Sequence, residues 1–232
     1  DRLSSKCSDT LSEQGQDYIQ RMMDAAQRMR NLIDDLLTLS RVSSQGNSNV
    51  PVDLAAVVEQ VISDLEVAIE QSGGRIEVGE LPTIDSDPTQ MRQLLQNLIS
   101  NALKFHKPDE PIVVKVKSRI LDDYILDDDR DDAVGAGVAK MVELTVEDTG
   151  IGFDETYSDR IFKVFQRLHG RDQYSGTGLG LAVCRKIAER HNGTITAKSK
   201  PGQGAKFIVT LPWNHTEGES TLWNNTASLL RS

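Results

Sequence analysis

The sequence has little cysteine, few aromatic residues and no long apolar run. Two cysteines in 232 residues, Cys7 and Cys184, exclude a disulfide framework and a zinc site, so we expect a reducing, cytoplasmic compartment. No run of about 18 apolar residues occurs, which excludes a membrane span within these residues. The chain begins at Asp1, with neither an initiator methionine nor the apolar segment of a signal peptide. We therefore expect a piece of a longer protein.

The charge balance is acidic. The chain has 26 Lys and Arg against 35 Asp and Glu, a formal net charge of −9. An excess of negative charge argues against non-specific binding to nucleic acid or to anionic lipid, since both depend on cations that meet phosphate. A local basic patch could still bind a phosphorylated ligand. Aromatic residues make up only 5%, but 38% of the residues are hydrophobic, so the composition is not that of a disordered chain. The length is enough for one sizeable domain, or for one domain with a helical appendage.

Residues 1–42 are predicted to be helical, with a break near Ser8–Gly15 that indicates a hairpin and leaves Arg2–Cys7 as a stub. Apolar residues step by four and three along the long helix, and a second stripe lies beside the first, which favours a four-helix bundle. The first stripe is Tyr18, Met22, Ala25, Met29, Leu32, Leu36 and Leu39, and the second is Ile19, Met23, Ala26, Ile33 and Leu37. This face needs a partner chain or a further helix; the alternative is packing on the chain's own globular domain.

The rest of the chain alternates between helix-like and strand-like periodicity. A polar linker is predicted at 43–52 and a polar tail at 214–232. Seven aspartates within Asp122–Asp132 predict a solvated hairpin loop, since their spacing is not that of an EF-hand. Helices are predicted at 53–71, 88–105 and 179–191, and strands at 75–78, 83–84, 112–119, 141–147, 194–199 and 205–211. This order predicts an α+β two-layer sandwich, with helices on one face of a sheet.

The helix at 88–105 carries an unusual polar stripe beside its apolar face. Asn97, Asn101 and Lys104 fall at positions i, i+4 and i+7, which places them on one side of the helix. An Asn oxygen ligates Mg²⁺ without adding charge, and a Lys meets phosphate. The alternative is an ordinary solvated face.

Two glycine-containing motifs follow. Asp148-Thr149-Gly150-Ile151-Gly152 comes directly after a strand, where an Asp can accept a hydrogen bond from an exocyclic amine and glycines let the backbone approach a flat base. Gly176-Thr177-Gly178-Leu179-Gly180-Leu181 precedes a helix, whose first N–H groups are suited to phosphate. It is neither a P-loop nor a Rossmann fingerprint. Either motif alone could be a simple turn.

The segment 153–175 between these motifs is too long for a passive connection. It is locally basic and has two phenylalanines, Phe162 and Phe165, which predicts a lid over a polyphosphate. The alternative is that both rings belong to the core. Its basic residues are Arg160, Lys163, Arg167 and Arg171.

The order and spacing of these segments resemble the N, G1, F and G2 boxes of sensor histidine kinases. The matching segments are Asn97–Phe105, Asp148–Gly152, Phe162–Phe165 and Gly176–Leu181, and Pro201–Phe207 is similar to a later strand turn of the same domain. The likeness covers about 53–213. The helix at 14–42 is similar to the second helix of the dimerisation and phosphotransfer hairpin, whose acceptor helix would be mostly missing. The stretch 162–196 is most similar to kinases with PAS or phytochrome-type sensors.

The resemblance implies the Bergerat-type ATP-binding fold, with a mixed sheet, that gyrase, the Hsp90 chaperones, these kinases and MutL share. The cofactors would be ATP and Mg²⁺. Asn101 would ligate the metal with support from Asn97, Lys104 would contact phosphate, and Asp148 would bind adenine N6. The further cofactor-binding positions implied are Gly150, Gly152, Phe162, Phe165, Arg167, Gly176, Thr177, Gly178, Leu179 and Gly180.

The resemblance also forces a choice between kinase and hydrolase. ATPases of this superfamily place a Glu general base four residues before the metal-binding Asn, and Asn97 occupies that position. We therefore expect phosphoryl transfer to a protein nucleophile. The alternatives are an ATPase or chaperone module and a degenerate, non-catalytic scaffold.

The phosphotransfer acceptor is missing from the expected place. The only histidines are His106, His169, His191 and His215, and none lies within 1–42. The simplest interpretation is that the acceptor precedes Asp1, so that this chain binds Mg-ATP but does not phosphorylate itself on that residue. The partners implied are a second copy through the hairpin helices, the receiver domain of a response regulator and an upstream sensor domain, with no nucleic acid and no membrane contact.

Overall fold

The computed structural model describes residues 12–44, 49–108, 110–125, 138–168, 170, 174 and 176–213. The predicted stub Arg2–Cys7, the tail 214–232 and most of the aspartate-rich stretch lie outside these residues. The helices are α2 (Glu13–Ser44), α3 (Leu54–Asp64), α4 (Glu66–Ser72), α5 (Pro88–Lys104) and α6 (Gly180–Arg190), with short 3₁₀ turns η1 (Glu155–Tyr157) and η2 (Arg160–Phe162). The strands are β1 (Val50–Asp53), β2 (Arg75–Val78), β3 (Thr83–Ser86), β4 (Val113–Ile125), β5 (Val138–Asp148), β6 (Thr194–Ser199) and β7 (Ala205–Pro212).

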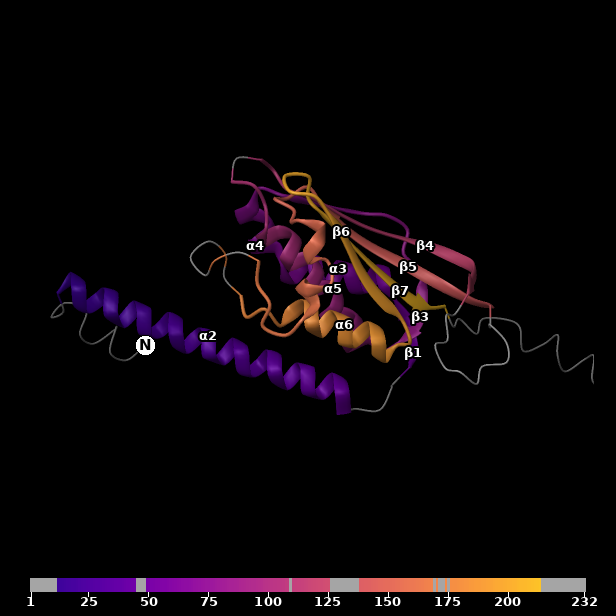
Figure 1. The fold of residues 1–232 in the computed structure, drawn as a ribbon, viewed down its shortest axis with the longest axis horizontal. Coiled ribbons are helices and arrows are strands. Elements are labelled where there is room, and N and C mark those ends of the chain that lie inside the picture. Colours follow the sequence, from indigo (N-terminus) through magenta and orange to yellow (C-terminus); the bar gives the residue numbers. More distant parts are fainter. Residues whose placement is uncertain are drawn as a thin grey trace, which may run out of the picture.

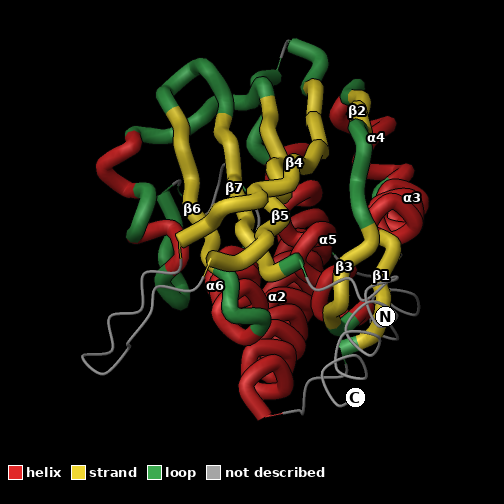
Figure 2. The backbone as a smooth tube through the Cα atoms, turned by 90° about the vertical axis from the view of Figure 1, so that its right-hand side faces the viewer, coloured by secondary structure: helices red, strands yellow, loops and turns green. Residues whose placement is uncertain are grey.

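The main sheet has five strands in the order β2-β4-β5-β7-β6. Strand β2 pairs with β4 in parallel and the other neighbours are antiparallel, so the sheet is mixed. In β6, Ile195 and Ala197 are buried while Thr194 and Lys198 are exposed, since side chains alternate between the faces of a strand. The helices of the described residues cover one face of this sheet (Figure 2). The predicted two-layer sandwich, preceded by a long helix, is confirmed.

Three local features differ from the prediction. Strand β4 continues to Ile125, so Asp122 and Asp123 of the predicted hairpin loop belong to a strand. Strand β1 begins in the predicted linker and pairs antiparallel with β3, from Val50 opposite Ser86 to Asp53 opposite Thr83. The segment predicted as one helix at 53–71 is two helices, because the chain leaves helical geometry at Leu65. Strand β1 was not predicted because its four residues include a proline, and so short a pattern does not reveal a strand.

Helix α5 is the centre of the helical layer. Asp87 caps it, since its carboxylate accepts the N–H groups of Thr89 and Gln90, and Pro88 occupies the first turn. Its buried hydrophobic residues are Met91, Leu94, Leu95, Leu98, Ile99, Ala102 and Leu103. Full burial of each large side chain contributes roughly 1.5–3 kcal/mol. This packing fixes the rotation of the helix and leaves Asn97, Asn101 and Lys104 at the rim of the core.

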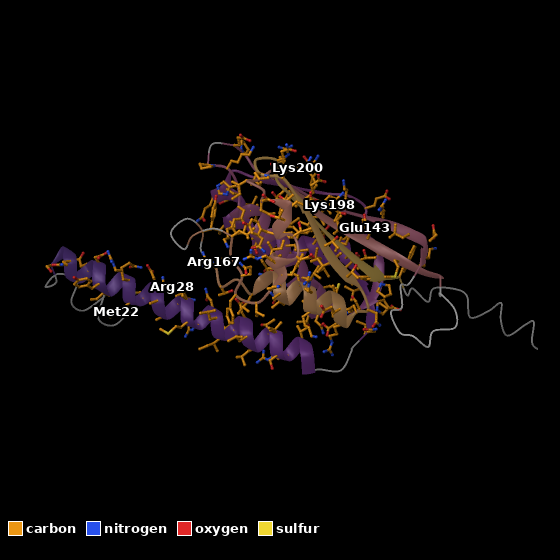
Figure 3. The ribbon with its side chains drawn as sticks, viewed as in Figure 1. Met22, Arg28, Glu143, Arg167, Lys198 and Lys200 are labelled. Atoms are coloured by element: carbon orange, nitrogen blue, oxygen red, sulfur yellow. The ribbon has the colours of Figure 1, made fainter. Side chains whose placement is uncertain are left out.

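The C-terminal part of α2 lies along α6, and the N-terminal part of α2 extends well beyond the sandwich (Figure 1). Leu39 packs against the core and Val42 is buried. Further toward the N-terminus, side chains such as Met22 project away from the rest of the molecule (Figure 3). Seven residues of the two apolar stripes are exposed: Tyr18, Met22, Ala26, Met29, Ile33, Leu36 and Leu37. Packing on the chain's own domain therefore accounts only for the C-terminal end of α2.

Within the described residues, no helix is both long enough and apolar enough to span a lipid bilayer.

Candidate functional site

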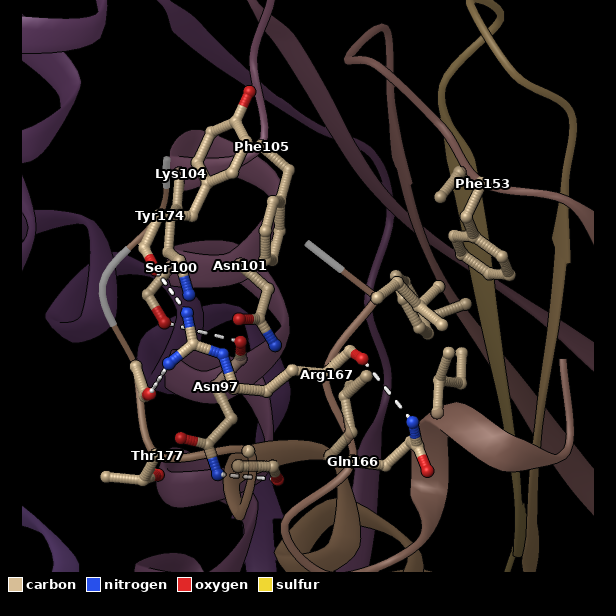
Figure 4. A pocket seen from close by; sticks show the side chains of 18 of the residues that line it. Asn97, Ser100, Asn101, Lys104, Phe105, Phe153, Gln166, Arg167, Tyr174 and Thr177 are labelled. Carbon is tan, nitrogen blue, oxygen red and sulfur yellow. Dashed lines mark hydrogen bonds between the residues drawn. The ribbon is translucent and has the colours of Figure 1, made fainter. Parts of the chain in front are cut away.

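A cavity of about 350 Å³ opens between α5, the segment after β5 and the loop before α6 (Figure 4). Its wall brings together residues from three of the four sequence motifs, which are up to 84 positions apart. The predicted site residues that line it are Asn97, Asn101, Lys104, Asp148, Gly152, Arg167, Gly176, Thr177, Gly178 and Gly180. Four predicted residues do not line it: Gly150, Phe162, Phe165 and Leu179.

The polar stripe of α5 lines the cavity with two carboxamides, Asn97 and Asn101, which differ in their hydrogen bonding. The Asn97 Nδ2 donates to the carbonyl oxygen of Gly180 at 3.2 Å, and Gln93 Nε2 donates to Asn97 Oδ1 at the same distance. Asn97 thus ties α5 to the first turn of α6. The Asn101 carboxamide has no hydrogen-bond partner among the described residues, so its oxygen is open to a ligand.

Lys104 is the cation of this stripe. Its Nζ lies 4.4 Å from the centroid of the Phe105 ring, which in turn packs against Tyr174 at 4.9 Å. Burial, together with the charge of Arg167, lowers the pKa of Lys104 from 10.5 to about 8. Two cations beside one cavity repel each other, and an anionic ligand would relieve that repulsion.

Asp148 also lines the cavity and is only 8% exposed. Its Oδ1 accepts the N–H of Gly150 at 2.8 Å and that of Ala205 at 3.2 Å, while Oδ2 has no partner among the described residues. Burial raises the pKa of Asp148 from 3.8 to about 6, although both N–H donors oppose the rise. The carboxyl group is therefore held in place by one oxygen and presents the other.

The glycines beside Asp148 are required by contacts within the protein. A Cβ on Gly150 would lie 2.3 Å from the carbonyl oxygen of Phe105, and a Cβ on Gly152 would lie 2.2 Å from that of Lys200. Gly152 also has φ of +62°, which disfavours any other residue. Gly152 lines the cavity, whereas Gly150 packs against the backbone of Phe105 and does not line it.

The predicted lid is folded around Arg167. Its guanidinium donates to the carbonyl oxygens of Gly176 at 2.7 Å and Tyr174 at 2.6 Å. All three residues line the cavity, so these bonds hold this part of the segment beside it. Phe162 lies in the core, edge-on to Phe207 at 6.4 Å, whereas Phe165 is 58% exposed. For Phe162 the structure matches the alternative of a core residue, and neither ring forms a hydrophobic wall of the cavity.

The loop before α6 presents a helix N-terminus to the cavity. The Thr177 Oγ1 accepts the N–H of Leu179 at 3.3 Å and donates to Asp35 Oδ2 at 2.5 Å. Leu179 itself is fully buried and provides no side-chain cap for α6. The first N–H groups of this helix therefore lie beside the wall that Gly178 and Gly180 form.

Sequence reasoning did not include several lining residues in the site. Phe105 and Tyr174 pair across the cavity edge, and Ser100 and Gln166 add polar groups. Asp35 comes from α2, 142 positions before Thr177, and no local pattern links the two. Only the tertiary packing of α2 against α6 brings them together.

Two family profiles match the chain. Residues 86–215 match the histidine kinase-, DNA gyrase B- and HSP90-like ATPase family, and residues 2–45 match the His Kinase A (phospho-acceptor) domain. The first match covers more than half of the chain, so the chain belongs to this ATPase family. The phospho-acceptor segment before it, and the relatives below, place it among the histidine kinases of two-component signal transduction.

Curated relatives and solved structures agree with this assignment. Phytochrome-like protein Cph1 of Synechocystis is 39% identical over 90% of this chain, and cyanobacterial phytochrome A of Nostoc is 35% identical over 94%. The chain spans about a quarter of the length of each relative, 26% in both cases. Full-length ShkA in complex with AMPPNP superimposes with a TM-score of 0.66 at 25% identity, covering 93% of this chain and 42% of that one. The Acinetobacter baumannii kinase AdeS shares the fold, with a TM-score of 0.62 at 23% identity over 85% of this chain and 84% of that one.

Proposed function

We propose that this chain binds Mg-ATP in the cavity and is the catalytic part of a sensor histidine kinase, which transfers the γ-phosphoryl group of ATP to a histidine on the dimerisation helix for relay to an aspartate of a response regulator. One observation carries the proposal: Asp148, Asn101 and Lys104 line a single cavity together with the glycine-rich start of α6. Asp148 would accept a hydrogen bond from adenine, and Asn101 would ligate Mg²⁺. Lys104 and the N–H groups at the start of α6 would donate hydrogen bonds to phosphate. A related solved structure was determined with AMPPNP, which supports the choice of nucleotide.

Asp148 is suited to bind the adenine. Its Oδ1 is saturated by two backbone N–H groups, so Oδ2 is left to accept the exocyclic amine. The wall beside it includes Ile151, Gly152 and Phe153, which offer apolar surface to a flat ring. A buried carboxylate that gains a donor is also relieved of part of its desolvation cost.

Asn101 is suited to bind Mg²⁺ as a neutral oxygen ligand. Among the described residues, no cluster of three His, Cys, Asp or Glu side chains could hold a metal ion without help. Because the protein offers few ligands, the phosphate oxygens of the nucleotide would supply most of the remaining ligands, as is common for Mg²⁺. When bound, the metal would neutralise charge on the phosphates, and Lys104 and Arg167 add positive charge at the same wall.

Kinase activity is favoured over hydrolysis by Asn97. A general base must accept a proton, and a carboxamide does not. The Asn97 side chain is also engaged with Gly180 and Gln93, which gives it a positioning role between α5 and α6. The site thus holds and polarises a nucleotide without a group at this position that activates water.

The acceptor histidine is absent from residues 1–105, which include the whole phospho-acceptor match. We therefore propose that the chain does not phosphorylate itself on the hairpin. The exposed apolar stripes of α2 support pairing with a second copy, and the receiver domain and sensor domain are partners that the family implies.

The test is incubation of the chain with γ-labelled ATP and Mg²⁺. We expect no phosphohistidine on the chain alone, and labelling of an added hairpin that carries the acceptor histidine of the Synechocystis relative. Asn101→Ala should abolish that labelling. Steady hydrolysis that Asn97→Ala removes would favour an ATPase, and absence of nucleotide binding would favour a scaffold.

A further inference from the structure

Helix α2 contributes one carboxylate to the wall of the nucleotide cavity. Asp35 lines the cavity, and its Oδ2 accepts the hydroxyl of Thr177 at 2.5 Å. The position of this acid is unexpected for a site that we propose to hold a polyphosphate, because a carboxylate and a phosphate repel each other.

The placement of Asp35 follows from a docked helix face. Asp35, Leu39 and Val42 are spaced i, i+4 and i+7, so they share one side of α2. Leu39 packs against the core, Val42 is 6% exposed, and the carbonyl oxygen of Val42 accepts a hydrogen bond from Arg190. Arg190 ends α6 and Thr177 precedes it, so α2 is fastened near both ends of α6. Asp35 is therefore held at the cavity by the docking of the whole face.

The group that Asp35 contacts belongs to the proposed phosphate site. Thr177 Oγ1 accepts the N–H of Leu179 directly before α6, an 11-residue helix with no side-chain cap at its start. The N-terminus of such a helix favours an anion, whether carboxylate or phosphate. Asp35 thus supplies negative charge where the resemblance of the Gly176–Leu181 motif implies that phosphate binds.

We propose that Asp35 is an internal anion that competes with the nucleotide phosphates for Thr177 and the start of α6, so that nucleotide binding and the docking of α2 oppose each other. This inference rests on the proposed function. By linkage, docking of α2 weakens nucleotide binding by the same factor by which nucleotide weakens docking. The bound nucleotide thereby releases the helix that belongs to the phosphotransfer hairpin.

The test compares Asp35→Asn with Asp34→Asn by calorimetric titration with ADP and with adenosine. Asp34 is exposed and adjacent, so its substitution makes the same change in net charge without touching the cavity. We expect Asp35→Asn to bind ADP roughly 5- to 10-fold more tightly than the parent, within the usual range of coupling between sites. Adenosine affinity should be equal in all three chains, since adenosine has no phosphate. In the parent, saturating ADP should accelerate amide hydrogen exchange at residues 35–42.

Equal ADP affinities in the parent and both variants would overturn the inference and leave the proposed function standing. A loss of affinity in Asp35→Asn that appears only with Mg²⁺ would also overturn it, since Asp35 would then be a metal ligand. Failure of the parent and both variants to bind ADP would overturn the proposed function and this inference together.

Discussion

The carboxylate of Asp148 and the amide of Ala205, 57 positions apart, are joined by a hydrogen bond of 3.2 Å. This bond ties the end of β5 to the start of β7 at the wall of the cavity. The same Oδ1 accepts the N–H of Gly150 at 2.8 Å. A single side chain therefore closes the end of a strand pair and presents its second oxygen to a ligand.

The buried Asp148 predicts a pH dependence of stability. Since burial raises the pKa of Asp148 to about 6, the folded chain favours the protonated acid. The contribution of Asp148 to the free energy of unfolding should be greatest below pH 4 and should be lost as the pH rises through 6. The difference between the parent and Asp148→Asn should change by up to about 3 kcal/mol over this range. Urea unfolding of both chains from pH 4 to pH 8 measures it, and a difference that stays constant with pH would contradict the assignment.

Lys104 predicts a pH dependence of nucleotide binding. Its pKa is lowered to about 8, and only the ammonium form attracts phosphate. ADP affinity should therefore fall between pH 7 and pH 9, while adenosine affinity should not. Lys104→Met should remove this dependence and weaken ADP binding roughly 10-fold or more at pH 7, as expected for loss of a charge-assisted contact. Calorimetry at several pH values gives both results, and an unchanged ADP profile in Lys104→Met would count against the role of Lys104.

Gly204 and Gly202 form a matched pair in the turn between β6 and β7. Both have positive φ, +84° and +77°, but a Cβ on Gly204 would lie 1.9 Å from the carbonyl oxygen of Asp148, whereas a Cβ on Gly202 meets nothing within 4 Å. Gly202→Ala should cost about 1–2 kcal/mol of unfolding free energy from backbone strain alone. Gly204→Ala should cost clearly more and should also weaken ADP binding. Thermal unfolding with and without ADP tests this, and equal effects of the two substitutions would argue against steric crowding at Asp148.

The exposed stripes of α2 predict self-association. Ile33 is 57% exposed in a stripe that has no partner in the described part of the chain. Ile33→Glu should lower the dimer fraction in sedimentation velocity without changing thermal unfolding of the sandwich, because a charge is costly in an apolar helix interface. Gln27→Glu, on an exposed polar position of the same helix, is the control. A dimer fraction equal in the parent and in Ile33→Glu would exclude this surface as the interface.

Local patterns predicted the elements that carry most of the cavity. The cap at Asp87, the apolar repeat of α5 and the spacing of Asn97, Asn101 and Lys104 are readable within one helix, and all three side chains line the cavity. The strand β1 was not predicted, because its pairing with β3 is not a local property. Asp35 was not predicted for the same reason, since only the packing of α2 places it beside Thr177.

Phe162 shows a second limit of sequence patterns. A phenylalanine in a basic segment is compatible with a lid and with the core, and only its contacts with Phe207 and Arg185 decide for the core. The spacing of a motif indicates where residues lie along the chain, but it does not indicate which side of the local backbone they take.

The most direct test of the account is calorimetric titration of the chain with ADP, with and without Mg²⁺, beside Asp148→Ala. We predict Mg²⁺-dependent binding to the parent, since Asn101 and the phosphates share the metal, and loss of binding in Asp148→Ala. A circular dichroism melt of the variant separates loss of the pocket from loss of the fold. No binding to the parent, or undiminished binding to a folded Asp148→Ala, would contradict the assignment of this cavity as the nucleotide site.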